Sequence, residues 1–176
     1  YGLGNLTGEV LAKKKQSTPD SWERLSDDIV HHVLQCNTWT DAHPDMVDGI
    51  VLAVPGVPNE DGTVSYAPNI KGLNNAEIST VLEEKLPATV FIENDVNIAA
   101  LGEYRTRKDK YSNMVFIAVG TGIGAGIILD GKLYQGPSHH AGEVGWLVTH
   151  PKYLITSNED KKGCLESQVS GPELVR

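Results

Sequence analysis

Asp95 closes a short polar segment, Glu93-Asn94-Asp95, that could take part directly in a chemical step. The segment lies where the apolar residues Thr89 to Ile92 give way to a helical pattern, and ligands of α/β sheets gather at such strand ends. A carboxylate placed there can act as a general base toward a hydroxyl group, and the amide of Asn94 can both donate to and accept from hydroxyls. Asp95 would also suit the N-cap of the helix that follows, and the two roles are compatible.

Two more carboxylates, Glu143 and Glu166, stand among small residues. Glu143 lies in the run Ala141 to Gly145, before an apolar segment expected to be a strand, and Glu166 follows Gly163-Cys164-Leu165 at an expected helix start. Ligands rich in hydroxyl groups favour such acceptors, because each hydroxyl needs a partner once it leaves water. Taken singly, each carboxylate suits a surface or capping position better. Trp146 is expected in the core, although it could stack on a ring-shaped ligand.

Four glycines alternate in the segment Gly120-Thr121-Gly122-Ile123-Gly124-Ala125-Gly126. Glycine lets a ligand approach the backbone closely, and consecutive N–H groups with the Thr121 hydroxyl could hold phosphate oxygens. No Lys-Ser/Thr pair follows, so this is not a Walker A loop, and the following strand does not fit a Rossmann fingerprint. By itself, a glycine-rich hairpin is structural as often as it binds a ligand.

The first part of the chain must supply strands and helices that position these residues. Tyr1 to Lys15 is typical of a hairpin that turns at Asn5 to Gly8. A helix with Thr18 as its cap is expected to run through Leu34, on the helical spacing of its apolar residues. The apolar run Asp48 to Val54 then predicts a buried central strand.

A second group of elements leads up to the polar segment and past it. Asp61-Gly62 predicts a tight hairpin turn. Asn74 and Glu77 resemble a capping box at the start of the next helix. The strand Thr89 to Ile92 and a helix of small residues, Val96 to Tyr104, complete the group.

The pattern then changes to a β-meander. Met114 to Val119 and Ala125 to Leu129 are expected strands, and Asp130-Gly131 predicts a further hairpin turn. Alternating strands and helices followed by a meander favour α/β lobes over a helical bundle.

The charged stretch Arg105 to Lys110 is the candidate boundary between two lobes, with an exposed loop of no boundary role as the alternative. On the first interpretation, residues 1–110 form an N-terminal lobe and residues 111–176 begin a C-terminal lobe.

Composition excludes several classes of protein. The 176 residues carry a net charge of −8, and an acidic surface disfavours binding of nucleic acid by this segment. The apolar runs are too short to span a membrane, and no signal peptide is visible. Cys36 and Cys164 lack a CxxC partner, which favours a reducing cytoplasm and excludes a zinc site made of cysteines alone.

Read in order, the segments from about Gly49 onward resemble the ROK family of bacterial sugar kinases and sugar-responsive repressors. END, GTGIG and AGE in this order and spacing are highly specific to that family. The matching segments are AVPG (53–56), APN (67–69), END (93–95), GTGIGAG (120–126), DG (130–131), AGEVG (141–145) and GCLE (163–166).

The resemblance implies an actin-like ATPase (ribonuclease H-like) fold of class α/β, with two lobes around a cleft that binds ATP and a sugar. It implies that Asp95 is the base that activates the sugar hydroxyl. Mg²⁺ would bridge the ATP phosphates, and a cytoplasmic homodimer is expected. The sugar would be bound by Asn69, Asn94, Glu143 and Glu166. The phosphates would be bound by Gly120, Thr121, Gly122 and Gly124.

Three features depart from the family pattern. The D-x-G-G-T phosphate motif would lie before Tyr1 and the adenine-binding part after Arg176, so the chain is expected to be truncated at both ends and inactive alone. The family's CxCGxxGC zinc loop retains only Cys164, so no structural zinc is expected. Trp146 replaces a histidine that commonly contacts the sugar, which leaves the identity of the sugar open.

Two functions remain in competition. An ATP-dependent kinase that phosphorylates a hexose or a hexose-containing glycoside is favoured by Asp95, by the intact GTGIG turn, and by Tyr1-Gly2-Leu3, which resembles the residues after the D-x-G-G-T motif in kinases. The alternative is the sugar-binding sensor domain of a ROK-type repressor, which keeps the fold without catalysis.

Overall fold

The computed structural model describes residues 1–67, 70–150 and 164–175. The chain divides into two compact units, Tyr1–Asn94 and Asp95–Arg176. The boundary predicted at residue 110 concerns the lobes of the complete fold and stays a prediction.

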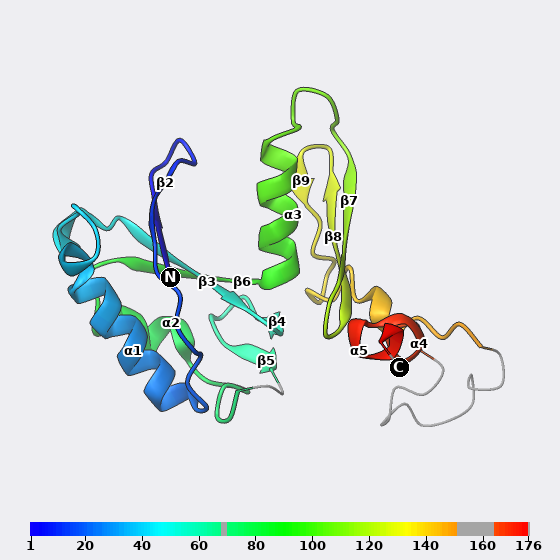
Figure 1. Cartoon of the computed structure of the whole chain (residues 1–176), viewed down its shortest axis with the longest axis horizontal. Coiled ribbons are helices and arrows are strands. Elements are labelled where there is room, and N and C mark those ends of the chain that lie inside the picture. Colours follow the sequence, from blue (N-terminus) through cyan, green and yellow to red (C-terminus); the bar gives the residue numbers. More distant parts are fainter. Residues whose placement is uncertain (68–69, 151–163, 176) are drawn as a thin grey trace. The chain divides into compact units, whose positions relative to one another are not determined.

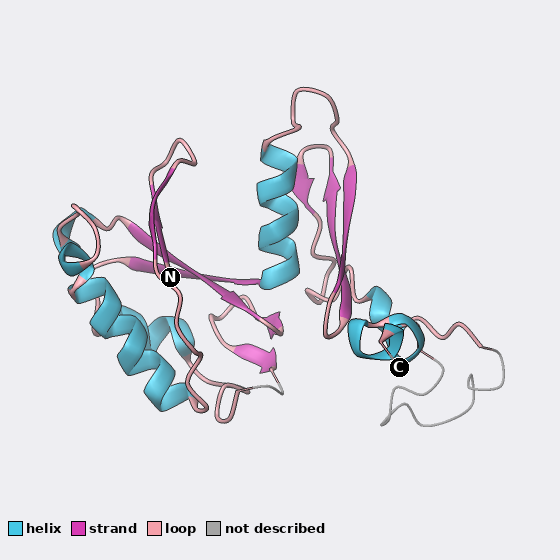
Figure 2. Ribbon diagram, viewed as in Figure 1, coloured by secondary structure: helices cyan, strands magenta, loops and turns pink. Residues whose placement is uncertain are grey.

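The first unit contains three two-stranded sheets (Figures 1 and 2). The expected N-terminal hairpin is present, with β1 (Gly2–Gly4) antiparallel to β2 (Val10–Lys13). The expected strand is β3 (Gly49–Val54), which pairs in parallel with β6 (Thr89–Asn94). It is not the buried central strand that was predicted, because it belongs to a two-stranded sheet and Val51 is 64% exposed.

A small antiparallel hairpin completes the strands of the first unit. β4 (Val57–Pro58) pairs with β5 (Val64–Tyr66), and the predicted turn between them has Gly62 at φ +80°. The Asp61 carboxylate accepts hydrogen bonds from the N–H and hydroxyl of Thr63, at 3.0 and 2.7 Å. These bonds lower the pKa of Asp61.

Two helices pack on these strands, and the predicted caps of both are wrong. α1 (Trp22–Leu34) is capped by Ser21 and not by Thr18, since the Arg24 N–H donates to Ser21 Oγ at 3.5 Å. α2 (Ile78–Glu83) has no side-chain cap at all. The side chain of Asn74 instead accepts from the Ala67 N–H at 2.6 Å.

Large apolar side chains from both helices and the strands form one core in the first unit. Leu73, Ile78 and Leu82 are fully buried in it, and two 3₁₀ helices (Cys36–Thr38 and Pro44–Met46) extend the unit beyond α1. The other buried members of this core are Trp22, Ile29, Val54, Val64, Ala67, Leu86 and Val90.

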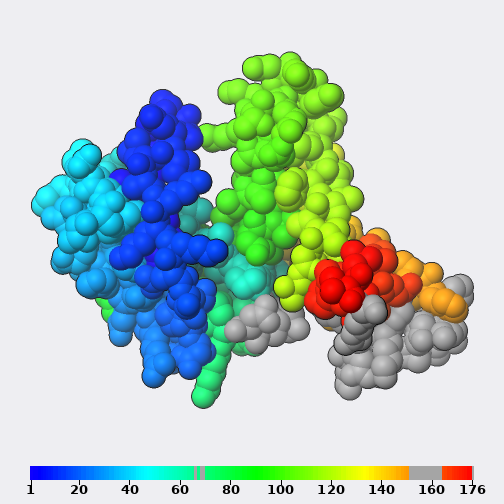
Figure 3. Space-filling model, viewed as in Figure 1, coloured from blue at the N-terminus to red at the C-terminus, as the bar shows by residue number. Residues whose placement is uncertain are grey.

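The β1–β2 hairpin stands out at the surface of the first unit (dark blue in Figure 3). Leu6 at its turn is 92% exposed, and Val10 and Leu11 on β2 are exposed as well. The Asn5 side chain shapes this turn by accepting from the N–H groups of Thr7 and Glu9.

The second unit contains the predicted antiparallel meander, which has three strands (Figure 2). A helix packs on it that the sequence had placed with the N-terminal lobe. α3 (Asp95–Arg105) is followed by β7 (Met114–Val119), β8 (Ile123–Leu129) and β9 (Lys132–Leu133), in the order β7-β8-β9. The β8–β9 turn has the predicted Asp130-Gly131 pair, with φ of 48° and 78°. Two short helices close the unit, α4 (Glu166–Val169) and α5 (Gly171–Leu174).

The backbone of β8 lies against α3 with almost no space between them. A Cβ at Gly126 would lie 2.3 Å from the Cβ of Ala100, and one at Gly124 would lie 3.3 Å from Val96. The alternating glycines of this segment therefore have a structural role in addition to any contact with a ligand.

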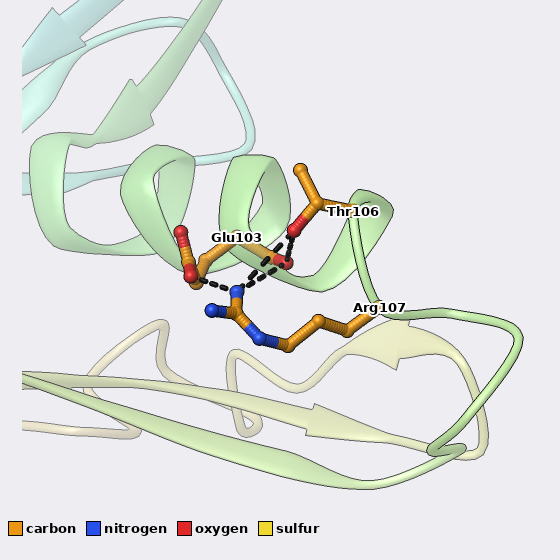
Figure 4. Close-up of polar contacts among 3 residues, drawn as sticks. All are labelled: Glu103, Thr106 and Arg107. Atoms are coloured by element: carbon orange, nitrogen blue, oxygen red, sulfur yellow. Dashed lines mark hydrogen bonds and ion pairs between the residues drawn. The ribbon is translucent and has the colours of Figure 1, made fainter.

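The charged stretch after α3 folds back on the end of the helix (Figure 4). Arg107 forms an ion pair with Glu103, and its guanidinium also donates to the Thr106 hydroxyl at 3.3 Å. The Thr106 hydroxyl in turn donates to the Glu103 carbonyl at 2.8 Å. A cation at this end complements the helix dipole, so the stretch stabilises the C-terminus of α3.

Candidate functional site

The predicted polar segment spans the junction of β6 and α3. β3 and β6 end together, because their parallel register pairs Val54 with Asn94. Asn94 is half-buried, and its amide donates to the Gly56 carbonyl at 3.0 Å. Its backbone N–H donates to Glu93 Oε1 at 2.9 Å. The bond to Gly56 fixes the orientation of the Asn94 side chain at the carboxyl end of the β3–β6 sheet.

Asp95 is the first residue of α3 and is exposed. Its carboxylate accepts from the Val96 N–H at 2.9 Å, so it lies within the first turn of the helix and not in the N-cap position suggested as its simpler role. A negative side chain in the first turn stabilises a helix through the dipole. The carboxylate remains accessible to a hydroxyl group of a ligand.

The glycine turn, residues Gly120 to Gly122, connects β7 to β8. Gly120 and Thr121 are exposed, and a Cβ at Gly120 would meet nothing within 4 Å. The Gly120 N–H donates to the Gly122 carbonyl at 2.9 Å. This bond uses the Gly120 N–H, while the open space around Gly120 lets a ligand approach the backbone of the turn.

Glu166 reaches the glycine turn from the first residue of α4. Its Oε2 accepts from the Ile123 N–H at 2.9 Å, across 43 residues of sequence. A Cβ at Gly122 would lie 2.6 Å from the same oxygen. The structure therefore brings together one predicted sugar ligand and the predicted phosphate-binding turn.

Residues Ala141 to Gly145 (AGEVG) pack along β8, on the edge that does not pair with β7. The Ala125 N–H donates to the Gly142 carbonyl at 2.7 Å, and Gly142 has φ +92°. A Cβ at Gly142 would lie only 1.8 Å from the Ala125 carbonyl oxygen, and one at Gly145 would lie 2.4 Å from the Ile123 carbonyl oxygen. Only glycine fits this approach of two backbones.

Two expectations for this segment are wrong. Glu143 is exposed, as expected of a ligand-binding or surface residue, but a 3₁₀ helix (Val144–Trp146) follows it where a strand was predicted. Trp146 is 36% exposed and does not lie in the core. After this 3₁₀ helix, Val148 forms an isolated antiparallel bridge with Cys164.

Gly171 also contacts the glycine turn, although nothing in the sequence predicted this. Its N–H donates to the Gly120 carbonyl at 2.7 Å, and a Cβ there would lie 2.7 Å from that oxygen. The composition of Ser170-Gly171-Pro172 predicts a turn, but it does not predict which other segment the turn contacts.

The remaining predicted residues can be placed only in part. Asn69 lies outside the described residues. Among the residues that the structure does describe, no group of three His, Cys, Asp or Glu side chains could hold a metal ion. Cys164 is buried, and residues 151–163, which precede it, lie outside the described residues. In the described parts of the chain, no helix is long and apolar enough to cross a membrane.

Sequence comparisons place these features in a known group of proteins. The ROK family model matches residues 1–176. A xylose repressor of Caldicellulosiruptor bescii is 35% identical over 98% of this chain and 44% of its own length. An N-acetyl-D-glucosamine kinase of Vibrio parahaemolyticus is 33% identical over 97% of this chain and 59% of its own length. The chain thus spans about half the length of these relatives.

Solved structures agree with the sequence comparisons. A ROK family glucokinase of Streptomyces griseus, solved with glucose and AMPPNP, has a TM-score of 0.79 and 31% identity over 99% of this chain and 55% of its own. A ROK family transcriptional regulator, a homologue of the MLC protein of E. coli, has a TM-score of 0.80 and 26% identity over 99% of this chain and 44% of its own. The predicted actin-like ATPase fold is confirmed. The chain belongs to the ROK family.

Proposed function

We propose that the protein containing this chain is an ATP-dependent sugar kinase that phosphorylates a hydroxyl of a hexose or of a hexose-containing glycoside. The observation that carries the proposal is the exposed carboxylate of Asp95 in the first turn of α3, directly after β6. As general base, Asp95 would accept the proton of the sugar hydroxyl while the hydroxyl oxygen attacks the γ-phosphorus of ATP. The bond from that phosphorus to the β,γ-bridging oxygen breaks, and ADP leaves. Positioned bases of this kind contribute about 10²- to 10⁴-fold to a rate.

Sugar binding is assigned to residues that can pair with hydroxyl groups. The Asn94 side chain is already oriented by its bond to the Gly56 carbonyl, so it has little conformational entropy to lose on binding. Glu143 offers an exposed carboxylate and Glu166 a half-buried one. Asn69 is retained as a fourth sugar ligand on the family resemblance alone.

The phosphates of ATP are assigned to Gly120, Thr121, Gly122 and Gly124. The absence of a side chain at Gly120, with open space around it, suits close approach of a phosphate to the backbone. Bound Mg²⁺ would neutralise charge on the phosphates. Phosphoryl transfer depends mainly on positioning and charge stabilisation, so the shape of the turn should matter as much as the base.

A sugar-binding sensor domain of a repressor is the second candidate. It is favoured by the xylose repressors of Caldicellulosiruptor bescii and Bacillus subtilis, which match 98% and 99% of this chain at 35% and 30% identity. A sensor would need the sugar ligands but not a general base or a phosphate-binding turn.

The two candidates differ in turnover. The test is a coupled assay of ADP release by the intact protein across hexoses and β-glucosides, with thermal unfolding measured beside it. Sugar-dependent ADP release would support the kinase and identify its substrate. If a sugar raises the melting temperature but gives no ADP release at any concentration of ATP, the kinase is rejected in favour of the sensor.

A further inference from the structure

The carboxylate of Glu166 is hydrogen-bonded to the first residue of β8. Its Oε2 accepts the Ile123 N–H at 2.9 Å, and Ile123 is buried, with 6% of its surface exposed. A hydrogen bond from a backbone N–H to a carboxylate is charge-assisted and stronger than one between neutral groups. A buried N–H that loses such a partner is costly, so this bond stabilises the conformation of the glycine turn.

The carboxylate of Glu166 occupies space that is free because positions 122 and 145 are glycines. A Cβ at Gly122 would lie 2.6 Å from Glu166 Oε2, and a Cβ at Gly145 would lie 3.0 Å from it. A Cβ at Gly120, in the same turn, would meet nothing within 4 Å. The need for glycine at position 122 therefore comes from Glu166 and not from crowding of the whole turn.

A second contact joins the segment that carries Glu166 to the same turn. The Gly171 N–H donates to the Gly120 carbonyl at 2.7 Å. The Ser170 N–H donates to the Glu166 carbonyl at 3.1 Å, which links the two contacts through α4. The turn is thus held at both of its ends, at Gly120 by the start of α5 and at Ile123 by the Glu166 side chain.

We propose that Glu166 is a positioning residue that couples the sugar to the phosphate-binding turn, an inference that rests on the proposed function. A sugar hydroxyl that donates to this carboxylate would bind a group that already shapes the turn. Each ligand then favours the same arrangement of Glu166 and the turn. Coupling of this kind is reciprocal, so the sugar should tighten binding of ATP by the same factor as ATP tightens binding of the sugar.

Two substitutions in the intact protein separate this role from that of a simple sugar ligand. Glu166→Gln keeps a carbonyl oxygen that can accept the Ile123 N–H, whereas Glu166→Ala removes the acceptor. In the absence of sugar, we expect Glu166→Ala to bind AMPPNP about tenfold more weakly and Glu166→Gln to bind it within about twofold of wild type. The proposal would be overturned if Glu166→Ala binds AMPPNP as tightly as wild type and only its binding of the sugar is weakened.

Hydrogen exchange at the Ile123 amide tests the bond itself and needs no ligand, so its result does not depend on whether the protein is a kinase. We expect exchange about tenfold faster in Glu166→Ala than in wild type. In Glu166→Gln it should be only about twofold faster, because the neutral carbonyl oxygen still accepts the bond but more weakly than a carboxylate. Gly122→Ala should also accelerate it, because its Cβ displaces the flexible end of Glu166, while Gly120→Ala in the same turn should not. Unchanged exchange in both Glu166→Ala and Gly122→Ala would contradict the inference even if sugar phosphorylation is observed.

Discussion

The two units differ in where their closest packing lies. In the first unit, side chains as large as Leu73, Ile78 and Leu82 are fully buried and touch across a layered core. In the second unit, the closest contacts are made where side chains are absent, as at Gly126 against α3 and Gly142 against β8. The difference predicts which substitutions each unit tolerates. Substitutions that reduce side-chain volume should destabilise the first unit most. Substitutions that increase side-chain volume should destabilise the second unit most.

Gly142→Ala is expected to have the largest effect. The new Cβ would lie 1.8 Å from the Ala125 carbonyl oxygen, and alanine would also have to adopt φ +92°. Together, overpacking and the strained φ should lower the free energy of unfolding by about 3–5 kcal/mol, as measured by denaturant titration.

A matched control separates the clash from the strain. Gly8 has a similar φ of +90°, but a Cβ there would meet nothing within 4 Å. Gly8→Ala should therefore cost only about 1 kcal/mol. Equal losses in the two variants would show that the close approach of Gly142 to β8 contributes nothing.

Leu82→Ala tests the opposite change in the first unit. Leu82 is fully buried in the core, so its truncation should leave a cavity and lower the free energy of unfolding by about 3 kcal/mol. Leu34→Ala, at the exposed end of α1, should change it by less than about 0.5 kcal/mol. A small effect of Leu82→Ala would mean that the first unit relies on its core less than its burial indicates.

Gly126→Ala should destabilise the second unit by about 2 kcal/mol, because its Cβ would lie 2.3 Å from the Cβ of Ala100. Ala100→Gly alone should cost about 1 kcal/mol through helix propensity. If the two methyl groups compete for one space, the double variant should be more stable than the sum of the single losses predicts. Strict additivity in this double-mutant cycle would contradict the packing of α3 on β8.

The smallest expected effect is a dependence of stability on pH in the first unit. His32 is buried, and its Nε2 lies 2.6 Å from Gln16 Oε1. Burial, and next the charge of Lys14, lower the pKa of His32 below its usual 6.5, while Asp28 opposes them. The folded state therefore binds fewer protons than the unfolded state just below pH 6.5, so stability is lost as the pH falls through this range.

His32→Gln should flatten this part of the stability profile, as followed by urea titration between about pH 5 and pH 7. His31→Gln, on the exposed face of the same helix, should leave most of the slope in place. An unaltered slope in His32→Gln would assign the pH dependence to other groups.

The local elements of both units could be predicted from the sequence. The turns at Asp61-Gly62 and Asp130-Gly131 were predicted because their residues tolerate positive φ, and the strands because of their apolar runs. The caps were harder to predict, since Thr18 and Ser21 are both good caps and only packing decides between them. Asn74 could not be placed, because its partner is the backbone of Ala67.

The candidate site shows the same division. The proposed role of Asp95 as a base and the openness of the glycine turn could both be inferred from residue types, at the end of a strand and in a hairpin. The bond between Glu166 and Ile123 joins residues 43 positions apart, and no local pattern encodes it. The contact of Gly171 with Gly120 was missed for the same reason.

The proposed role of Asp95 is tested most directly by the steady-state kinetics of Asp95→Asn in the intact protein, with the best sugar found in the ADP-release assay. Asparagine keeps the size of the side chain but cannot accept the proton, so kcat should fall by about 10²- to 10⁴-fold. The KM for the sugar should change little, since the substitution removes an interaction made in the transition state. A variant that retains kcat within about twofold of wild type would contradict the role of Asp95 as general base.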